Sequence, residues 1–188
     1  MLAIRIRTRY FDVKGFHLTI TRDPIAEARR QWETHGWGPA APGMTAVTTI
    51  VRIHQILVAR VEEALAPFGL SFARFEILRL LGFTRTGRLP MGKISDRLQV
   101  HPASVTSAVK RLEREGLLHR EAGHDDSRVV LAAILPKGRE LLVPATAAVN
   151  RVFENTGLDQ DSLESLIALV RPIRDLAGDF LNGTSHLG

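Results

Sequence analysis

The residues best suited to chemistry form a short segment after Pro102. At helical spacing it carries small and hydroxyl-bearing side chains first and cations later: Ala103, Ser104, Thr106, Ser107, Lys110 and Arg111. Small side chains at the start of a helix allow close approach to DNA base edges, and longer cations reach the phosphates. This gradient predicts a DNA-reading helix. Taken by itself, the segment leaves a merely solvated, charged helix open as the alternative.

The residues around this segment predict a helix-turn-helix. Met91, Ile94 and Leu98 fall at helical spacing and predict a short supporting helix. After the link 99–101, Pro102 suits the first position of the next helix, where its missing N–H costs nothing. The stripe that this second helix would turn to the core is Val105, Ala108, Val109 and Leu112.

A β-wing is predicted to follow. Residues 117–121 and 129–134 have strand character, and the Gly- and Asp-containing residues 122–126 between them predict a turn. Arg128 stands near the tip of this hairpin, where a cation can enter the negative potential of a narrow minor groove. Asp126 is placed to orient Arg128 through a charge-assisted hydrogen bond.

This order of elements resembles the MarR family of bacterial winged-helix regulators, over Gly43 to about Leu181. The segments that carry the resemblance are Pro67-Phe68-Gly69-Leu70-Ser71, Pro102-Ala103-Ser104-Val105-Thr106, Arg111-Leu112-Glu113-Arg114-Glu115-Gly116-Leu117 and Asp126-Ser127-Arg128. One departure is Ile134-Leu135-Pro136, where the family usually has Leu-Thr before the next helix. The hydroxyl cap is lost there, so Pro136 must start that helix.

The resemblance implies a mainly α fold with a small β-wing and a dimeric architecture. We expect these segments: 1–22, an N-terminal arm; 23–43, an added helix and linker; 44–70, a first dimerisation helix; 71–136, the winged helix-turn-helix lobe; and 137–188, the C-terminal dimerisation helices. The family dimerises through its terminal helices and binds near-palindromic DNA. The apolar stripe of residues 163–180 agrees, because one small lobe cannot cover it.

Several signals mark the ends of these longer helices. The apolar spacing that begins at Thr45 stops at Pro67, and Pro144 interrupts the stripe that begins at Leu141. Asp159 is placed to cap the last helix, and Pro172 should kink it. Near the N-terminus, Asp23 and Pro24 predict the start of a short helix that a linker, residues 36–43, follows.

The first 22 residues leave alternatives open. Residues 2–7 and 16–20 alternate like strands around 12–15. This pattern is compatible with a hairpin, a flexible basic arm or an artefact of start-codon choice, and we favour a poorly ordered arm.

Family resemblance also implies an effector cleft between the dimer helices and the winged lobe, which commonly takes small aromatic or anionic compounds. Trp32, His54, Arg74 and Glu76 fall on elements that border it. In the urate-responsive branch, a Trp on the added helix and an Asp on the helix here formed by 72–81 belong to this site, but Glu76 stands in place of that Asp. For Trp32 we favour an anchor of the added helix, and for His54 a packed core residue.

Composition excludes some classes of protein and agrees with the rest. The chain has 188 residues, a net charge of +5 and a pI near 10.4, which favours a polyanionic partner, although a GC-rich coding bias towards Arg would also produce it. Absence of cysteine excludes disulfides and thiol switches. No apolar run approaches a membrane span and no signal peptide is apparent, so we expect a cytoplasmic protein without a membrane partner.

The chain offers little for catalysis or metal binding. No nucleophile–base pairing, phosphate loop or metal spacing supports an enzyme, and we expect no cofactor. Turn chemistry and proximity to DNA explain the wing residues His119, His124, Asp125 and Asp126 better than a metal does. The sequence therefore predicts a homodimeric repressor that binds a palindromic operator in double-stranded DNA and is released by a small effector. A constitutive DNA-binding protein without an effector is the alternative, and an enzyme is the interpretation that we favour least.

Overall fold

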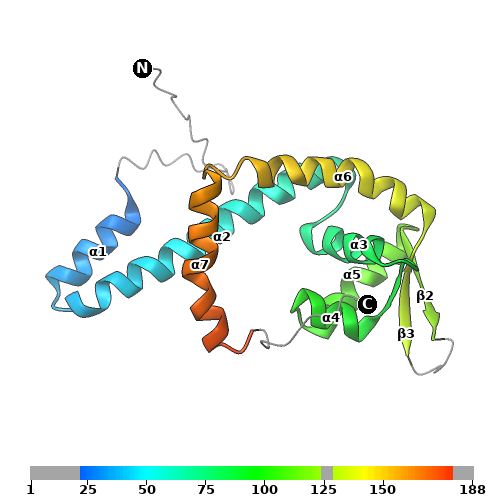
Figure 1. The fold of residues 1–188 in the computed structure, drawn as a ribbon, viewed down its shortest axis with the longest axis horizontal. Helices are drawn as coiled ribbons and strands as arrows, with labels where there is room; N and C mark the ends of the chain where they lie inside the picture. Colours follow the sequence, from blue (N-terminus) through cyan, green and yellow to red (C-terminus); the bar gives the residue numbers. More distant parts are fainter. Residues whose placement is uncertain (1–21, 124–128, 180–188) are drawn as a thin grey trace, which may run out of the picture. The chain divides into compact units, whose positions relative to one another are not determined.

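The computed structural model describes residues 22–123 and 129–179. The chain divides into two compact units, Met1–Ile56 and Leu57–Gly188. The elements in chain order, drawn in Figure 1, are α1 (Pro24–Thr34), the 3-10 turn η1 (Gly38–Ala40), α2 (Ala41–Leu65), the 3-10 turn η2 (Ala66–Phe68), α3 (Phe72–Phe83), β1 (Arg88–Pro90), α4 (Met91–Leu98), α5 (Pro102–Arg114), β2 (Leu118–Ala122), β3 (Val130–Ile134), α6 (Pro136–Glu154) and α7 (Gln160–Leu176). The mainly helical fold with a small wing is confirmed.

The first unit holds α1, η1 and the first part of α2. The Asp23 carboxylate caps α1 by accepting a hydrogen bond from the Ile25 N–H at 2.9 Å, and Pro24 occupies the first helical position, as predicted. The predicted linker 36–43 is too long. Helix α2 begins at Ala41, four residues before Thr45, because Pro42 is tolerated in a first turn. The arm alternatives for residues 1–21 concern a segment outside the described residues.

Helix α2 is long and apolar. The stretch Gly38–Phe68 passes as a membrane span by length and composition, which corrects the expectation that no apolar run approaches that length. Its charged residues include Arg52, Glu62 and Glu63, and Glu62 accepts a hydrogen bond from the Phe72 N–H at 2.8 Å. The helix ends before η2, which contains Pro67, and Gly69 then adopts a left-handed φ of 64°. The predicted stop at Pro67 is confirmed.

The second unit contains a three-stranded antiparallel sheet in the order β1-β3-β2. Strands β2 and β3 pair from Leu118 opposite Ile134 to Ala122 opposite Val130, and the Gly123 N–H donates to the Val129 carbonyl at 2.8 Å to close the hairpin. These are the two predicted wing strands. Strand β1, which pairs Arg88 with Ala133, was not predicted, because three residues are too few for a strand pattern.

One apolar core joins α3, α4, α5, the sheet and α6, and Figure 1 shows the three short helices gathered beside the hairpin. The predicted stripes are confirmed: the buried members are Ile94, Val105, Val109 and Leu112, and Ala108, Met91 and Leu98 pack against them. Ser95 is also buried. Its hydroxyl is satisfied there by donating to the Val100 carbonyl at 2.5 Å, and this hydrogen bond closes the turn between α4 and α5. At this turn Gln99 takes a left-handed φ of 53°.

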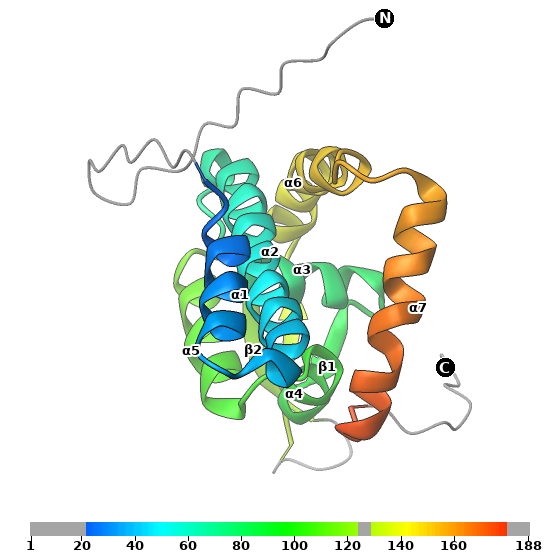
Figure 2. The ribbon, with the colours of Figure 1, turned by 90° about the vertical axis from the view of Figure 1, so that its left-hand side faces the viewer.

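Helices α6 and α7 complete the second unit. Pro136 starts α6 without any side-chain cap, as predicted, but the helix continues through Pro144, so the predicted interruption is wrong. Asp159 caps α7 by accepting from the Ser162 N–H at 2.9 Å, which confirms that prediction, and α7 includes Pro172. Helix α7 has no buried residue, and Figure 2 shows it set apart from α3 and α6.

Gly138 lets the first turn of α6 pass close to the backbone of the wing. A Cβ at this position would collide with the Leu117 carbonyl oxygen, which belongs to backbone and cannot move aside cheaply. The Leu135 N–H donates to that same carbonyl at 3.0 Å, so the contact fixes α6 against the residue that precedes β2.

We therefore expect Gly138→Ala to destabilise the fold by about 1–3 kcal/mol, the usual result of overpacking. The matched control is Gly92→Ala in α4, where a Cβ meets nothing within 4 Å and alanine favours the helix. Chemical denaturation of both variants measures the difference. Equal stabilities of Gly138→Ala and the parent would contradict the close approach.

Candidate nucleic-acid interface

The N-terminus of α5 is built by His101 and Pro102. The His101 Nδ1 accepts a hydrogen bond from the Ala103 N–H at 3.2 Å, and Pro102 occupies the first helical position. The first turn contains no acidic side chain. The positive end of the helix dipole is therefore not neutralised by a carboxylate in that turn, which favours an anionic partner.

The exposed face of α5 carries most of the predicted DNA-contacting residues. Five of the six that lie on this helix are exposed: Ala103, Ser104, Ser107, Lys110 and Arg111. Thr106 is half-buried, and its hydroxyl donates to the Pro102 carbonyl at 3.0 Å. The Thr106 oxygen is thus left as an acceptor, which suits it less to contacting phosphate oxygens than to contacting the amino groups of base edges.

An open groove of about 520 Å³ runs along this face. The residues that line it are Ser71, Arg74, Ala103, Ser104, Ser107, Ala108 and Arg111. The start of α3 thus forms one wall and the exposed face of α5 the other. The groove brings together four of the predicted contacts with two residues of α3 that belong to its first turn and cap.

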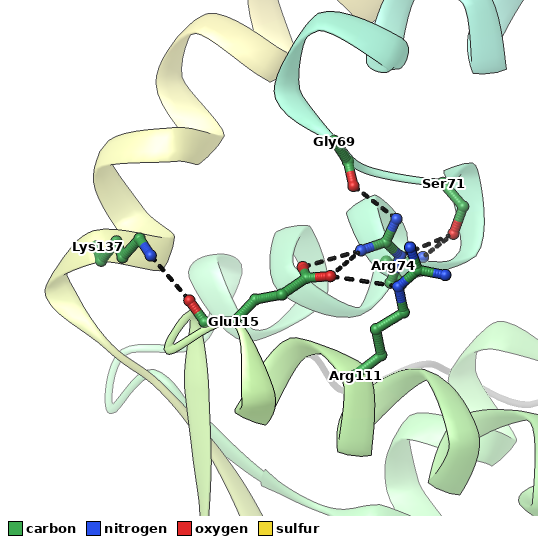
Figure 3. Close-up of polar contacts among 6 residues, drawn as sticks. All are labelled: Gly69, Ser71, Arg74, Arg111, Glu115 and Lys137. Carbon is green, nitrogen blue, oxygen red and sulfur yellow. Dashed lines mark hydrogen bonds and ion pairs between the residues drawn. The ribbon is translucent and has the colours of Figure 1, made fainter.

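A cluster of polar contacts beside the groove centres on Arg74, as Figure 3 shows. The Arg74 Nη1 donates to both carboxylate oxygens of Glu115 at 2.9 Å, and its Nη2 donates to the Gly69 carbonyl at 2.6 Å. The Arg74 Nε donates to the Ser71 hydroxyl at 3.3 Å, and the Arg74 side chain is only 8% exposed. Glu115 also accepts from the Arg111 Nε at 3.2 Å. A buried guanidinium thus links the α2–α3 junction to the end of α5.

Two further contacts hold the C-terminal end of α5. The Lys137 Nζ donates to the Glu115 carbonyl at 2.9 Å, which complements the negative end of the helix dipole. Glu113 accepts from the Arg120 N–H at 3.0 Å and from its Nε at 2.9 Å. These hydrogen bonds from Arg120 lower the pKa of Glu113 below its usual range. The end of α5 is therefore attached to both α6 and β2.

The wing is described up to its tip. Arg128 and Asp126 lie outside the described residues, as do His124 and Asp125. In the half of β2 nearer the hairpin tip, the Glu121 carboxylate forms an ion pair with Arg88 of β1 at 3.1 Å, and its other oxygen lies 3.0 Å from the His119 Nε2. Within residues 22–123 and 129–179, no three His, Cys, Asp or Glu side chains group as metal ligands.

The four candidate effector residues fall in different units. Trp32 and His54 belong to the first, while Arg74 and Glu76 belong to the second. The geometry argues against an effector role for Arg74, because Glu115, Gly69 and Ser71 already occupy its guanidinium. His54 is exposed in the monomer, so the expectation of a packed core histidine is wrong for the monomer.

The other two candidates, Trp32 and Glu76, are both half-buried. Trp32 is half-buried and meets Trp37 edge to face, with ring centroids 5.3 Å apart, which agrees with an anchor of the α1–η1 turn. Glu76 is half-buried, and burial raises the pKa of its carboxyl group.

The sequence analysis did not single out Glu115, which contacts both Arg74 and Arg111. Its spacing of four residues from Arg111 is a helical ion-pair signal that could have drawn attention to it. Its contact with Arg74 joins residues 41 positions apart in the sequence, and no local sequence pattern predicts such a contact.

Comparisons with known proteins point to one family. A sequence profile of the MarR family matches residues 70–130. The crystal structure of Sco5413, a MarR family transcriptional regulator from Streptomyces coelicolor, is 43% identical, with a TM-score of 0.67 over 74% of this chain and 97% of that one. Two HTH-type transcriptional regulators of Bacillus subtilis (strain 168) also match: YkoM is 36% identical over 55% of this chain and 67% of its own length, and MhqR is 32% identical over 53% of this chain. The match spans 63% of the length of MhqR.

The raised pKa of Glu76 generates a pH-dependent prediction. Because the folded-state pKa is raised, the ionised carboxylate destabilises the fold at neutral pH, and this penalty disappears as pH falls below the ordinary value of 4.5. Glu76→Gln should therefore be more stable than the parent at pH 7. The difference should shrink on acidification through the folded-state pKa.

Thermal unfolding across that pH range measures the effect, with the exposed Glu140→Gln of α6 as the matched control. If Glu76→Gln has the same stability as the parent at every pH, burial does not destabilise the ionised form of this carboxylate.

Proposed function

Because this chain belongs to the MarR family of transcriptional regulators, we propose that it is a homodimeric repressor that binds a palindromic operator and is released by a small molecule. The observation that carries the proposal is the exposed face of α5, with Ser104, Ser107, Lys110 and Arg111 beside an open groove. Its opposite side is fixed in the core by Val105, Val109 and Leu112, as a helix that enters the major groove requires.

The proposed division of labour along α5 follows side-chain length. Ala103, Ser104 and Ser107 approach base edges, while Lys110 and Arg111 reach phosphates or the bases beside them. Arg128 at the wing, oriented by Asp126, is proposed to enter the adjacent minor groove. A transcription regulator acts on DNA inside the cell, so we expect a cytoplasmic protein with no membrane partner.

The proposed homodimer rests on the apolar surface of α7. Leu169 is 75% exposed, Ile173 60% and Leu176 91%, all on a helix with no buried residue. Such a surface on a soluble protein marks an interaction site. A second copy is its proposed occupant, and the segments 44–70 and 137–188 are the proposed dimerisation helices.

Two-fold symmetry then constrains the operator. Two α5 helices that read one face of B-DNA must lie about one helical turn, roughly 34–36 Å, apart. The operator is therefore proposed to be an inverted repeat with half-site centres about 10 base pairs apart.

Effector release requires a ligand that binds the DNA-incompetent arrangement more tightly than the competent one. Small aromatic or anionic compounds are the proposed class, with Trp32, His54 and Glu76 as candidate contacts. A constitutive DNA-binding protein is the alternative. Thermal-shift screening followed by operator release distinguishes the two, because a constitutive protein stays on its operator in the presence of every ligand that stabilises it.

Two substitutions on α5 test the DNA-binding face. Lys110→Ala should lower the salt slope of operator binding by about one unit per half-site if Lys110 contacts a phosphate. Ser107→Trp should weaken operator binding far more than non-specific binding, because bulk at this position blocks the base edges. Titrations at several salt concentrations measure both effects.

The exposed Arg151→Ala of α6 is the matched cation control and should behave like the parent. If Lys110→Ala and Ser107→Trp also bind like the parent at matched salt, the DNA-binding face has been misplaced.

A charge on α7 tests the dimer. Leu169→Glu should shift the sedimentation of the protein from dimer to monomer, since burial of an unpaired carboxylate costs several kcal/mol in effective terms, about the scale of an interface hot spot. Glu164→Gln, an exposed polar position of the same helix, serves as the control. A folded Leu169→Glu protein that remains fully dimeric would exclude α7 from the interface.

A further inference from the structure

Glu115 serves two cations of different exposure. Its Oε1 accepts from the Arg74 Nη1 at 2.9 Å and from the Arg111 Nε at 3.2 Å, and its Oε2 accepts from the same Arg74 Nη1 at 2.9 Å. The Arg74 side chain is 8% exposed, whereas that of Arg111 is 58% exposed. One carboxylate therefore joins a buried, hydrogen-bonded cation to a cation on the proposed DNA-binding face (Figure 3).

The contact to Arg111 uses Nε and leaves the end of the guanidinium unoccupied. Among the residues that the structure describes, the two Nη atoms of Arg111 have no hydrogen-bond partner. Arg111 lines the groove together with Ser104 and Ser107. A planar pair of N–H groups fits two acceptors side by side, either two phosphate oxygens or the O6/N7 edge of guanine.

Arg74 supplies the rigidity that this arrangement needs. An exposed ion pair four residues apart on a helix is too weak to fix a long side chain. Here the carboxylate is also held by a guanidinium that is itself fixed by the Gly69 carbonyl at 2.6 Å and the Ser71 hydroxyl at 3.3 Å. These contacts hold the Glu115 carboxylate in one orientation. Its hydrogen bond with the Arg111 Nε in turn orients the Arg111 guanidinium.

Charge balance agrees with attraction to DNA. The guanidinium groups of Arg74 and Arg111 carry two positive charges, and the Glu115 carboxylate removes one of them. One net positive charge remains at the groove, so the carboxylate can orient Arg111 without reversing the local potential.

We infer that Glu115 is a positioning residue for DNA recognition: anchored by Arg74, it holds Arg111 through Nε and presents the two Nη atoms as a preset fork for a phosphate or a guanine edge. The inference rests on the proposed function. It assigns the Arg74–Glu115 pair a role in presenting Arg111 in addition to its role in the fold.

The test uses the full chain and a duplex that the parent selects from a randomised library. Arg111→Lys keeps the charge but removes Nε and the fork, and it leaves the Arg74–Glu115 pair intact. It should lose roughly tenfold in affinity, almost as much as Arg111→Ala. The matched control is Arg151→Lys, an exposed arginine on α6 outside the proposed DNA-binding face, which should bind like the parent.

Glu115→Gln completes a double-mutant cycle. It should weaken binding in the parent but add nothing in the Arg111→Ala background, because its effect passes through Arg111. A merely structural Glu115 would weaken both backgrounds equally, which would overturn the inference. Tighter binding by Glu115→Gln would also overturn it, since Glu115 would then withhold Arg111 from DNA. Thermal unfolding of each variant identifies any loss of fold, in which case the Arg111 variants alone decide.

The salt dependence distinguishes the two acceptors. A slope reduced by about one unit per half-site in Arg111→Ala identifies a phosphate, and an unchanged slope with lost discrimination against guanine substitutions identifies a base. If the parent selects no duplex, the proposed function fails. If the parent selects one and Arg111→Lys binds it equally well, only the inference fails.

Discussion

The buried guanidinium of Arg74 is the interaction on which the geometry of the proposed DNA-binding face depends. Its side chain is 8% exposed and makes hydrogen bonds to Gly69, Ser71 and Glu115. Removal of one partner of a buried ion pair typically costs about 3–5 kcal/mol because the other charge is left uncompensated, and the 36% exposure of Glu115 places this pair at or below the lower end of that range. Loss of Glu115 would therefore destabilise the fold and also remove one of the three partners that orient the Arg74 side chain.

The consequence is mechanical as well as energetic. Gly69 lies at the junction of α2 and α3, and Glu115 lies just after α5. The Arg74 side chain therefore connects that junction to the end of the helix that we propose contacts DNA. Lys137 attaches the same end of α5 to the start of α6, and Gly138 allows α6 to pass against the residue before β2. A displacement of α6 would thus be transmitted to α5 through short, directional contacts.

Local patterns predicted much of this structure. Helical spacing located α4 and α5, the apolar β-branched run located β3, and Asp23, Pro24, Pro136 and Asp159 marked helix starts correctly, since each of these signals acts over a few residues. Pro144 was misleading because packing of Leu142, Ala145 and Val149 in the core outweighs one lost backbone hydrogen bond. The exposed His54 shows the same limit, since a helical stripe identifies an apolar face without saying which surface covers it. Arg74 and Glu115, 41 residues apart, could be paired only by the fold.

We propose that the exposed face of α5 lies in the major groove of the operator. Because the chain has no cysteine, a single Arg114→Cys substitution, at an exposed position in the last turn of α5 and outside the proposed base contacts, gives a unique site for an iron–EDTA cleavage reagent. Cleavage of operator DNA by the labelled protein should fall in two clusters, about one helical turn apart, with each cluster opposite the proposed base contacts. A label at the control position Glu140→Cys on α6 should cleave weakly and without such a pattern. Cleavage from position 140 that matches or exceeds that from position 114 would contradict the proposal.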